Sequence, residues 1–132
     1  MTLFVDASAL VAIIREESEA PELREVLGGH VVRLTSGLAL WETARAMSRG
    51  DSDGPLAAMA EAERYCRAFD IAVVPIGAAE AAEAVRAHAR YGKGTGHPAR
   101  LNMGDCFAYA CAKTNDARLL YEGDDFIHTD LA

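Results

Sequence analysis

The sequence has 132 residues, which is enough for one compact domain with a buried core and too short for two. No stretch approaches the roughly 20 consecutive apolar residues of a membrane span, and Leu3–Val5 follows Met1 without the basic segment of a secretory signal, so we expect a cytoplasmic protein. The net charge of −7 excludes a protein that binds nucleic acid over its whole surface, because phosphate binding draws on clustered Lys and Arg.

Short apolar segments alternate with longer segments of helical period along the chain. In chain order, the patterns predict a strand over Thr2–Val5, helices over Ser8–Ile14 and Ser18–Leu27, a strand over Val31–Thr35, a helix over Gly37–Arg49, a helix from Asp53 to about Phe69, a strand over Ile71–Ile76, helices over Ala78–Tyr91 and Gly104–Lys113, and a strand over Arg118–Tyr121. This alternation is typical of a parallel sheet with helices on its faces, so we expect an α/β fold in a single domain spanning residues 1–132.

Helix boundaries are indicated by capping residues. Pro21 suits the first turn of the second helix, Ser36 suits the N-cap of the third, and Gly50 suits its end. The segment 92–98 contains three glycines and a proline, which predicts an irregular loop.

Cysteine and histidine usage argues against disulfides and against zinc. The cysteines are Cys66, Cys106 and Cys111. They are odd in number, lack CxxC spacing and fall in predicted helices, so we expect buried reduced thiols. The histidines are His30, His88, His97 and His128. They fall in separate segments without the spacing of metal ligands, and we expect no catalytic histidine.

Asp6 and Glu42 are two candidate site residues. Asp6 directly follows the first predicted strand, where ligands bind in open parallel sheets, and Ser8 can hydrogen-bond its carboxylate. A plain helix N-cap is the alternative interpretation of Asp6. Glu42 lies inside the third predicted helix, where a surface ion pair with Arg45 or Arg49 is the alternative.

Asp105, Asp124 and Asp125 are further candidates. Asp105 begins an otherwise apolar helix whose composition predicts burial, and a buried carboxylate has to be capped, paired or coordinated. Asp124 and Asp125 follow the last predicted strand, although an acidic turn would explain them as well.

Four acidic positions at strand ends and helix starts of one small sheet indicate a cation site. Carboxylates brought together repel one another unless a cation neutralises them, and hard oxygen ligands without His or Cys suit Mg²⁺ or Mn²⁺. Such ions support phosphodiester hydrolysis by activating water and stabilising charge on the phosphate.

Four segments, in this order, resemble the successive motifs of VapC-type PIN domains. They are Asp6-Ala7-Ser8-Ala9-Leu10, Leu40-Trp41-Glu42-Thr43-Ala44, Asn102 to Ala110 and Leu119 to Phe126. The loop Tyr91 to Gly94 and the segment His128-Thr129-Asp130 also resemble a common subgroup of this family.

The resemblance implies a PIN-like three-layer α/β/α sandwich with a short, mostly parallel sheet of four or five strands. It implies an Mg²⁺- or Mn²⁺-dependent endoribonuclease that is the toxin of a toxin–antitoxin pair, acts on transfer, ribosomal or messenger RNA, is inhibited by a VapB-like antitoxin, and forms homodimers. Carried over by motif, Asp6 and Asp105 are the principal metal ligands, Glu42 completes the acidic pocket, and Ser8 orients Asp6. The pattern before Phe126 favours Asp125 as the fourth acid, with Asp124 beside it.

Basic and aromatic side chains are candidates for contact with RNA. The basic candidates are Arg45, Arg49, Arg86, Arg90, Lys93 and Arg100. They could attract phosphates toward an acidic pocket, or they could be ordinary surface charges. The aromatic candidates for stacking a base are Trp41, Tyr65, Phe69, Tyr91 and Tyr109, but we expect core or interface packing for most of them.

One departure from the family pattern concerns the segment after the last strand. Many PIN domains place Thr or Ser there, whereas this sequence has Tyr121 and Glu122.

Two alternative functions remain open. A PIN-fold scaffold without catalysis would bind RNA or protein only. An aspartate-based phosphotransfer domain is less favoured, because the dehalogenase-like type needs an Asp where Ser8 stands.

Overall fold

The protein is built on one parallel β-sheet. The computed structural model describes residues 1–50 and 53–132. Its strands are β1 (Thr2–Val5), β2 (Val32–Ser36), β3 (Ile71–Val74) and β4 (Arg118–Leu120), arranged in the order β3-β2-β1-β4. All neighbouring strands are parallel, and Leu3 of β1 lies in register with Arg33 of β2 and Arg118 of β4. The carboxyl ends of the strands therefore lie at one edge of the sheet.

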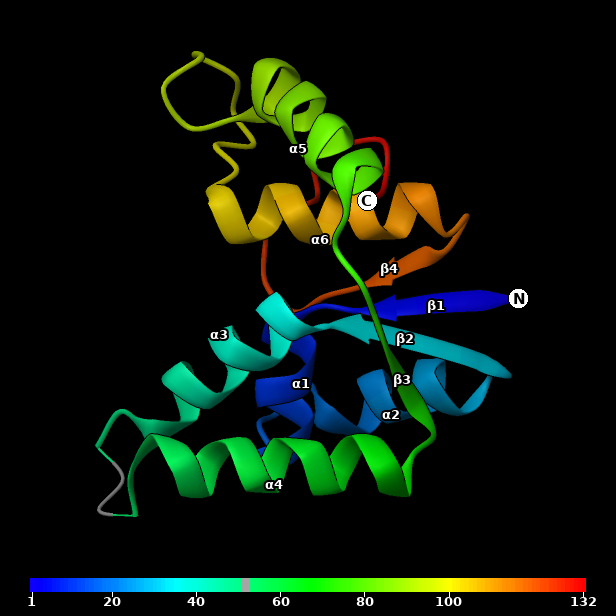
Figure 1. Ribbon diagram of the computed structural model, residues 1–132, viewed down its shortest axis with the longest axis vertical. Coiled ribbons are helices and arrows are strands. Elements are labelled where there is room, and N and C mark those ends of the chain that lie inside the picture. Colours follow the sequence, from blue (N-terminus) through cyan, green and yellow to red (C-terminus); the bar gives the residue numbers. More distant parts are fainter. Residues whose placement is uncertain (51–52) are drawn as a thin grey trace.

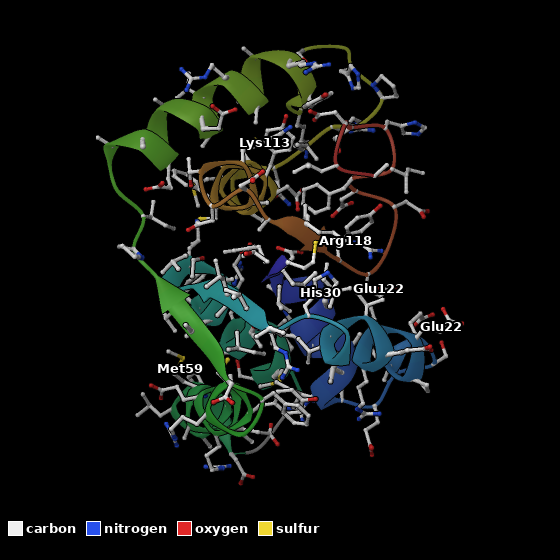
Figure 2. The ribbon with its side chains drawn as sticks, turned by 90° about the vertical axis from the view of Figure 1, so that its right-hand side faces the viewer. Glu22, His30, Met59, Lys113, Arg118 and Glu122 are labelled. Carbon is white, nitrogen blue, oxygen red and sulfur yellow. The ribbon has the colours of Figure 1, made fainter. Side chains whose placement is uncertain are left out.

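Helices cover both faces of this sheet (Figure 1). Those in the described part of the chain are α1 (Ala7–Ile14), α2 (Ala20–Gly28), α3 (Gly37–Ser48), α4 (Gly54–Ala68), α5 (Ala78–Tyr91) and α6 (Met103–Thr114). In Figure 2, Lys113 of α6 and Met59 of α4 lie on opposite sides of the sheet. The expected three-layer α/β/α arrangement with a short parallel sheet is confirmed.

The alternation of side chains along β1 creates two separate cores. Leu3 and Val5 belong to the core formed with α1 to α4, whereas Phe4 belongs to the core formed with α5 and α6. All three side chains are fully buried. A central parallel strand covered on both faces is apolar along its length, which is why this strand has no polar alternation.

The observed element boundaries differ from the expected ones by one or two residues, for local reasons. β3 ends at Val74 because Pro75 cannot donate to the next strand. α6 begins at Met103 because the Asn102 side chain caps it by accepting a hydrogen bond from Asp105 N at 2.9 Å. Ser36 ends β2 and also caps α3, as expected, by accepting from Ala39 N at 3.1 Å. α2 starts later than expected, at Ala20, with Glu19 at the N-cap position and no side-chain cap.

The glycine-containing segment 92–98 forms an irregular loop, as expected. Gly94 and Gly96 have φ angles of 92° and 88°, which glycine adopts without strain. Backbone hydrogen bonds from Leu101 N to Tyr91 O and from Lys93 N to Leu101 O close the base of the loop. The three cysteines are buried and free. Within the described residues, no helix is long and apolar enough to cross a membrane.

Candidate active site

Asp6 is the first residue after β1, and its side chain caps α1. Its Oδ2 accepts hydrogen bonds from Ser8 N at 3.2 Å and from Ser8 Oγ at 2.6 Å. The Ser8 hydroxyl in turn accepts from Glu122 N at 3.0 Å, so it links Asp6 to the segment after β4. Burial raises the pKa of Asp6, and the charge of Asp125 raises it further. The capping interpretation of Asp6 is therefore confirmed, and its role in a functional site stays a prediction.

Glu42 lies on α3 and packs against the start of α6. A Cβ atom built on Gly104 would overlap the Glu42 carboxylate, so a glycine at this position makes the close approach possible. Within the described residues, Glu42 forms no ion pair, and the expected alternative of a pair with Arg45 or Arg49 is absent. Partial burial raises the pKa of Glu42 to about 7, with a contribution from the charge of Asp6.

Asp105 lies in the first turn of α6 and is held by a reciprocal capping box. Asp105 Oδ2 accepts a hydrogen bond from Asn102 N at 3.1 Å, while Asn102 Oδ1 accepts from Asp105 N. Burial raises the pKa of Asp105 to about 7, because the Asn102 hydrogen bond only partly offsets burial and the charges of Asp125, Asp6 and Glu42.

These carboxylates line one cleft of about 490 Å³ at the carboxyl edge of the sheet. Its acidic lining residues are Asp6, Glu17, Glu42, Asp105, Glu122 and Asp125. Asp125 lines the cleft and Asp124 does not, although both side chains are exposed. Asp6, Glu42 and Asp105 therefore lie at this cleft, together with one of the two candidates for the fourth acid, Asp125.

Two predicted basic residues are at this cleft, and four are not. Arg45 of α3 and Arg49, which directly follows this helix, belong to its lining. The others are Arg86, Arg90, Lys93 and Arg100. Arg86 pairs with Glu83 at 2.8 Å on the exterior of α5, and Arg90 lies over the Tyr91 ring. Lys93 lines a separate apolar groove between α5 and α6.

Several residues at or beside the cleft were not predicted as site residues. Asn102 and Gly104 carry no charge, and their effect depends on their contacts with Asp105 and Glu42. Glu122 follows β4, and Glu17 lies between α1 and α2. The signal available for Glu122 was its position after a strand. None of the four histidines is among the lining residues.

The donor set fits a hard divalent cation, but a closed metal site is not formed. Carboxylate oxygens are the ligands preferred by Mg²⁺ and Mn²⁺, and the raised pKa values reflect the cost of holding these carboxylates charged together. In residues 1–50 and 53–132, no group of three or more His, Cys, Asp or Glu side chains is arranged to hold an ion. The arrangement is thus an open acidic cleft.

The fold and this cleft define an α/β protein with an acidic site at the carboxyl ends of its strands. The family model for the PIN domain matches residues 3–131. The chain therefore belongs to the PIN-domain family.

Similar proteins are named as VapC ribonucleases. A VapC ribonuclease of Mycobacterium bovis is 38% identical over 129 residues, covering 98% of this chain and 96% of the relative. A VapC ribonuclease of Rhizobium meliloti is 38% identical over 139 residues, covering 97% of this chain and 98% of the relative. Ribonuclease VapC of Mycolicibacterium smegmatis is 37% identical over 132 residues, covering 98% of each chain. These relatives place the chain with the VapC type.

Proposed function

We propose that this protein is an Mg²⁺- or Mn²⁺-dependent endoribonuclease and the toxin of a toxin–antitoxin pair. The observation that carries the proposal is the set of carboxylates Asp6, Glu42, Asp105 and Asp125 in one cleft. The pKa values of Asp6, Glu42 and Asp105 are raised by burial and by neighbouring acidic charge. Perturbed carboxyl groups that share a cleft are typical of a functional site.

The same four carboxylates would hold the cation. Mg²⁺ commonly keeps several waters and is bound through few carboxylates, so an open acidic cleft is compatible with it. When bound, the cation supplies charge neutralisation and an activated water for phosphodiester hydrolysis. The chain's own contribution is orientation: Ser8 holds Asp6, Asn102 holds Asp105, and Gly104 leaves space for Glu42.

Arginines at the cleft support RNA as the substrate. An acidic cleft alone repels a phosphate backbone, whereas Arg45 and Arg49 at the same cleft offer positive charge close to the carboxylates. The relatives' names specify ribonucleases. Hydrolysis of an RNA phosphodiester bond is therefore the reaction that fits both sets of charges.

A catalytically silent scaffold is the second candidate. The observation that favours it is the absence, among the described residues, of a ready group of three metal-binding side chains. A silent scaffold has no need to keep four mutually repelling carboxylates in one cleft, and this argues for the nuclease.

Cleavage of total cellular RNA by the purified, antitoxin-free protein tests the nuclease, with EDTA, Mg²⁺ or Mn²⁺ and with sequencing of new RNA ends. We expect discrete metal-dependent cuts that Asp105→Asn abolishes, because this substitution removes a charged oxygen ligand. A matched control is Asp124→Asn, which removes a neighbouring charge outside the cleft lining and should leave the cuts unchanged. A folded protein that makes no cut with either metal would support the scaffold.

The partners and location are proposed on the basis of the VapC relatives. We propose a VapB-like antitoxin, a homodimer, and a cytoplasmic location where RNA is available. In the same assay, a small protein encoded by the neighbouring gene should suppress the cuts. Retention of full cleavage in a stable complex with that protein would contradict inhibition, and a single-chain mass by light scattering would contradict the homodimer.

A further inference from the structure

Trp41 is exposed beside the acidic cleft. It is the single tryptophan of the sequence, it directly precedes Glu42 on α3, and 56% of its surface is accessible. Trp41 is therefore not buried in the core of the described chain. Isolated exposed apolar residues are common, so exposure alone assigns no role.

The neighbour of Trp41 supplies a second observation. The guanidinium carbon of Arg45 lies 5.6 Å from the centre of the Trp41 ring, and Arg45 also lines the cleft. Six acidic residues line the same cleft, yet in the described part of the chain Arg45 forms no ion pair with any of them. The arginine is thus held by an aromatic ring and keeps its donors available.

Trp41 and Arg45 are four residues apart on α3, which places their side chains on one face of the helix, and both are exposed. Arg49 is the C-cap residue of α3 and has an extended backbone, so it lies beyond this helix face. Arg45 and Arg49 line the cleft, whereas Trp41 is not among the lining residues. The pair of Trp41 and Arg45 therefore extends from the cleft lining onto the adjoining surface of the helix.

We propose that Trp41 and Arg45 form a platform that binds one nucleotide of single-stranded RNA, next to the nucleotide that occupies the cleft. The indole stacks on the base and the guanidinium contacts the adjoining phosphate, which are the two contacts that proteins commonly use on unpaired nucleic acid. The inference rests on the proposed function, because it assigns a binding surface to the same site. The platform would bind unpaired RNA in preference to paired RNA, since a base stacked within a duplex offers no free face to the indole.

Tryptophan fluorescence tests the platform directly, because the whole indole signal of the protein comes from Trp41. The protein is titrated in EDTA with a ten-nucleotide oligoadenylate RNA and with an abasic oligonucleotide of the same length. We expect the RNA to quench the fluorescence and the abasic strand to leave it unchanged, because only bases stack on the ring. Equal responses to the two strands, or RNA binding by anisotropy without quenching, would overturn the platform, and so would the absence of binding.

Substitutions separate stacking from charge. Trp41→Ala should weaken RNA binding at least about fivefold, whereas Trp41→Phe should retain most of the affinity. Arg45→Ala should lower the dependence of binding on salt by about one phosphate contact. Arg118→Ala is the matched control, since this exposed arginine begins β4 at the opposite end of the strands (Figure 2) and should change neither property. If Arg118→Ala weakens binding as much as Arg45→Ala, the platform is wrong.

The cleavage assay distinguishes this inference from the proposed function. Quenching by RNA without metal-dependent cuts would support the platform and reject the nuclease. Discrete cuts by a protein whose fluorescence does not respond to RNA would support the nuclease and reject the platform.

Discussion

Gly104 illustrates how an uncharged residue can decide the position of a charged one. The Glu42 carboxylate occupies the space that a Cβ at position 104 would need. The overlapping atoms are at the flexible end of the glutamate side chain, so a larger residue would displace the carboxylate without disturbing the backbone. The position of Glu42 in the cleft therefore depends on the absence of a side chain on α6.

We predict that Gly104→Ala impairs cleavage while leaving the fold intact. Alanine is favoured over glycine in a helix by up to about 1 kcal/mol, so the free energy of unfolding should stay equal or rise. Activity should fall toward that of Glu42→Ala because the carboxylate has to rotate away. Urea unfolding and cleavage rates measure the two effects.

A double-mutant comparison controls this prediction. In the Glu42→Ala background, Gly104→Ala should cause no further loss of cleavage, because no carboxylate remains to be displaced. A further loss of the same size would show that Gly104 acts through another contact.

The candidate acids and the contact of Ser8 with Asp6 could be predicted at the residue scale, but the roles of Asn102 and Gly104 could not. Asp6, Glu42, Asp105 and Asp125 follow strands or lie in otherwise apolar helices, and both features can be recognised in the sequence. The importance of Gly104 depends on a contact between α3 and α6 that local periodicity does not encode. Which of the basic residues lie at the cleft could not be predicted either, because this depends on where each helix lies around the sheet.

At the scale of elements, α6 depends on the cap that also positions Asp105. We predict that Asn102→Ala lowers the free energy of unfolding by about 1 kcal/mol, the usual cost of losing an N-cap acceptor. It should also reduce cleavage, because the Asn102 side chain holds the backbone that carries Asp105. Urea unfolding and the RNA assay measure both effects.

Asn102→Ser is the matched control for this cap. Serine keeps an N-cap acceptor, so stability and cleavage should both remain close to those of the original protein. A loss of stability in Asn102→Ala with unchanged cleavage would assign Asn102 to the helix alone.

The sequence predicted every described helix and strand in the observed order, because the change from short apolar runs to helical period is a strong local signal. The less predictable feature was where each element ends. β3 ends at Val74, directly before Pro75, and this limit was visible in the sequence. α2 starts at Ala20 without a side-chain cap, so no capping residue marks its start in the sequence.

At the scale of the whole molecule, the acidic cleft should make stability depend on pH. The pKa values of Glu42 and Asp105 are raised by burial from 4.5 and 3.8 to about 7. Between these values the folded protein keeps protons that the unfolded chain releases, so these groups lower the free energy of unfolding as pH rises from about 4 to 7. Above that range their effect no longer changes.

A divalent cation should counteract this loss. We predict that Mn²⁺ raises the melting temperature strongly near pH 8 and little near pH 5, because the cation binds the deprotonated carboxylates. Thermal unfolding with EDTA or Mn²⁺ across this range measures the effect, and Glu42→Gln should flatten the pH dependence. Equal stabilisation by Mn²⁺ at both pH values would contradict this coupling between protonation and cation binding.

The pairing of β1 with β4 brings together segments from opposite ends of the described chain, since Leu3 lies in register with Arg118. Asp6 and Glu42 leave the ribosome long before Asp105 and Asp125 do. Contacts between such distant segments require the closure of a long loop, which makes them slow to form. A nascent chain that has not yet reached Asp125 therefore carries only part of the acidic cleft, and a cell that makes a toxin of this design is not exposed to the activity of a complete cleft before that residue has been synthesised.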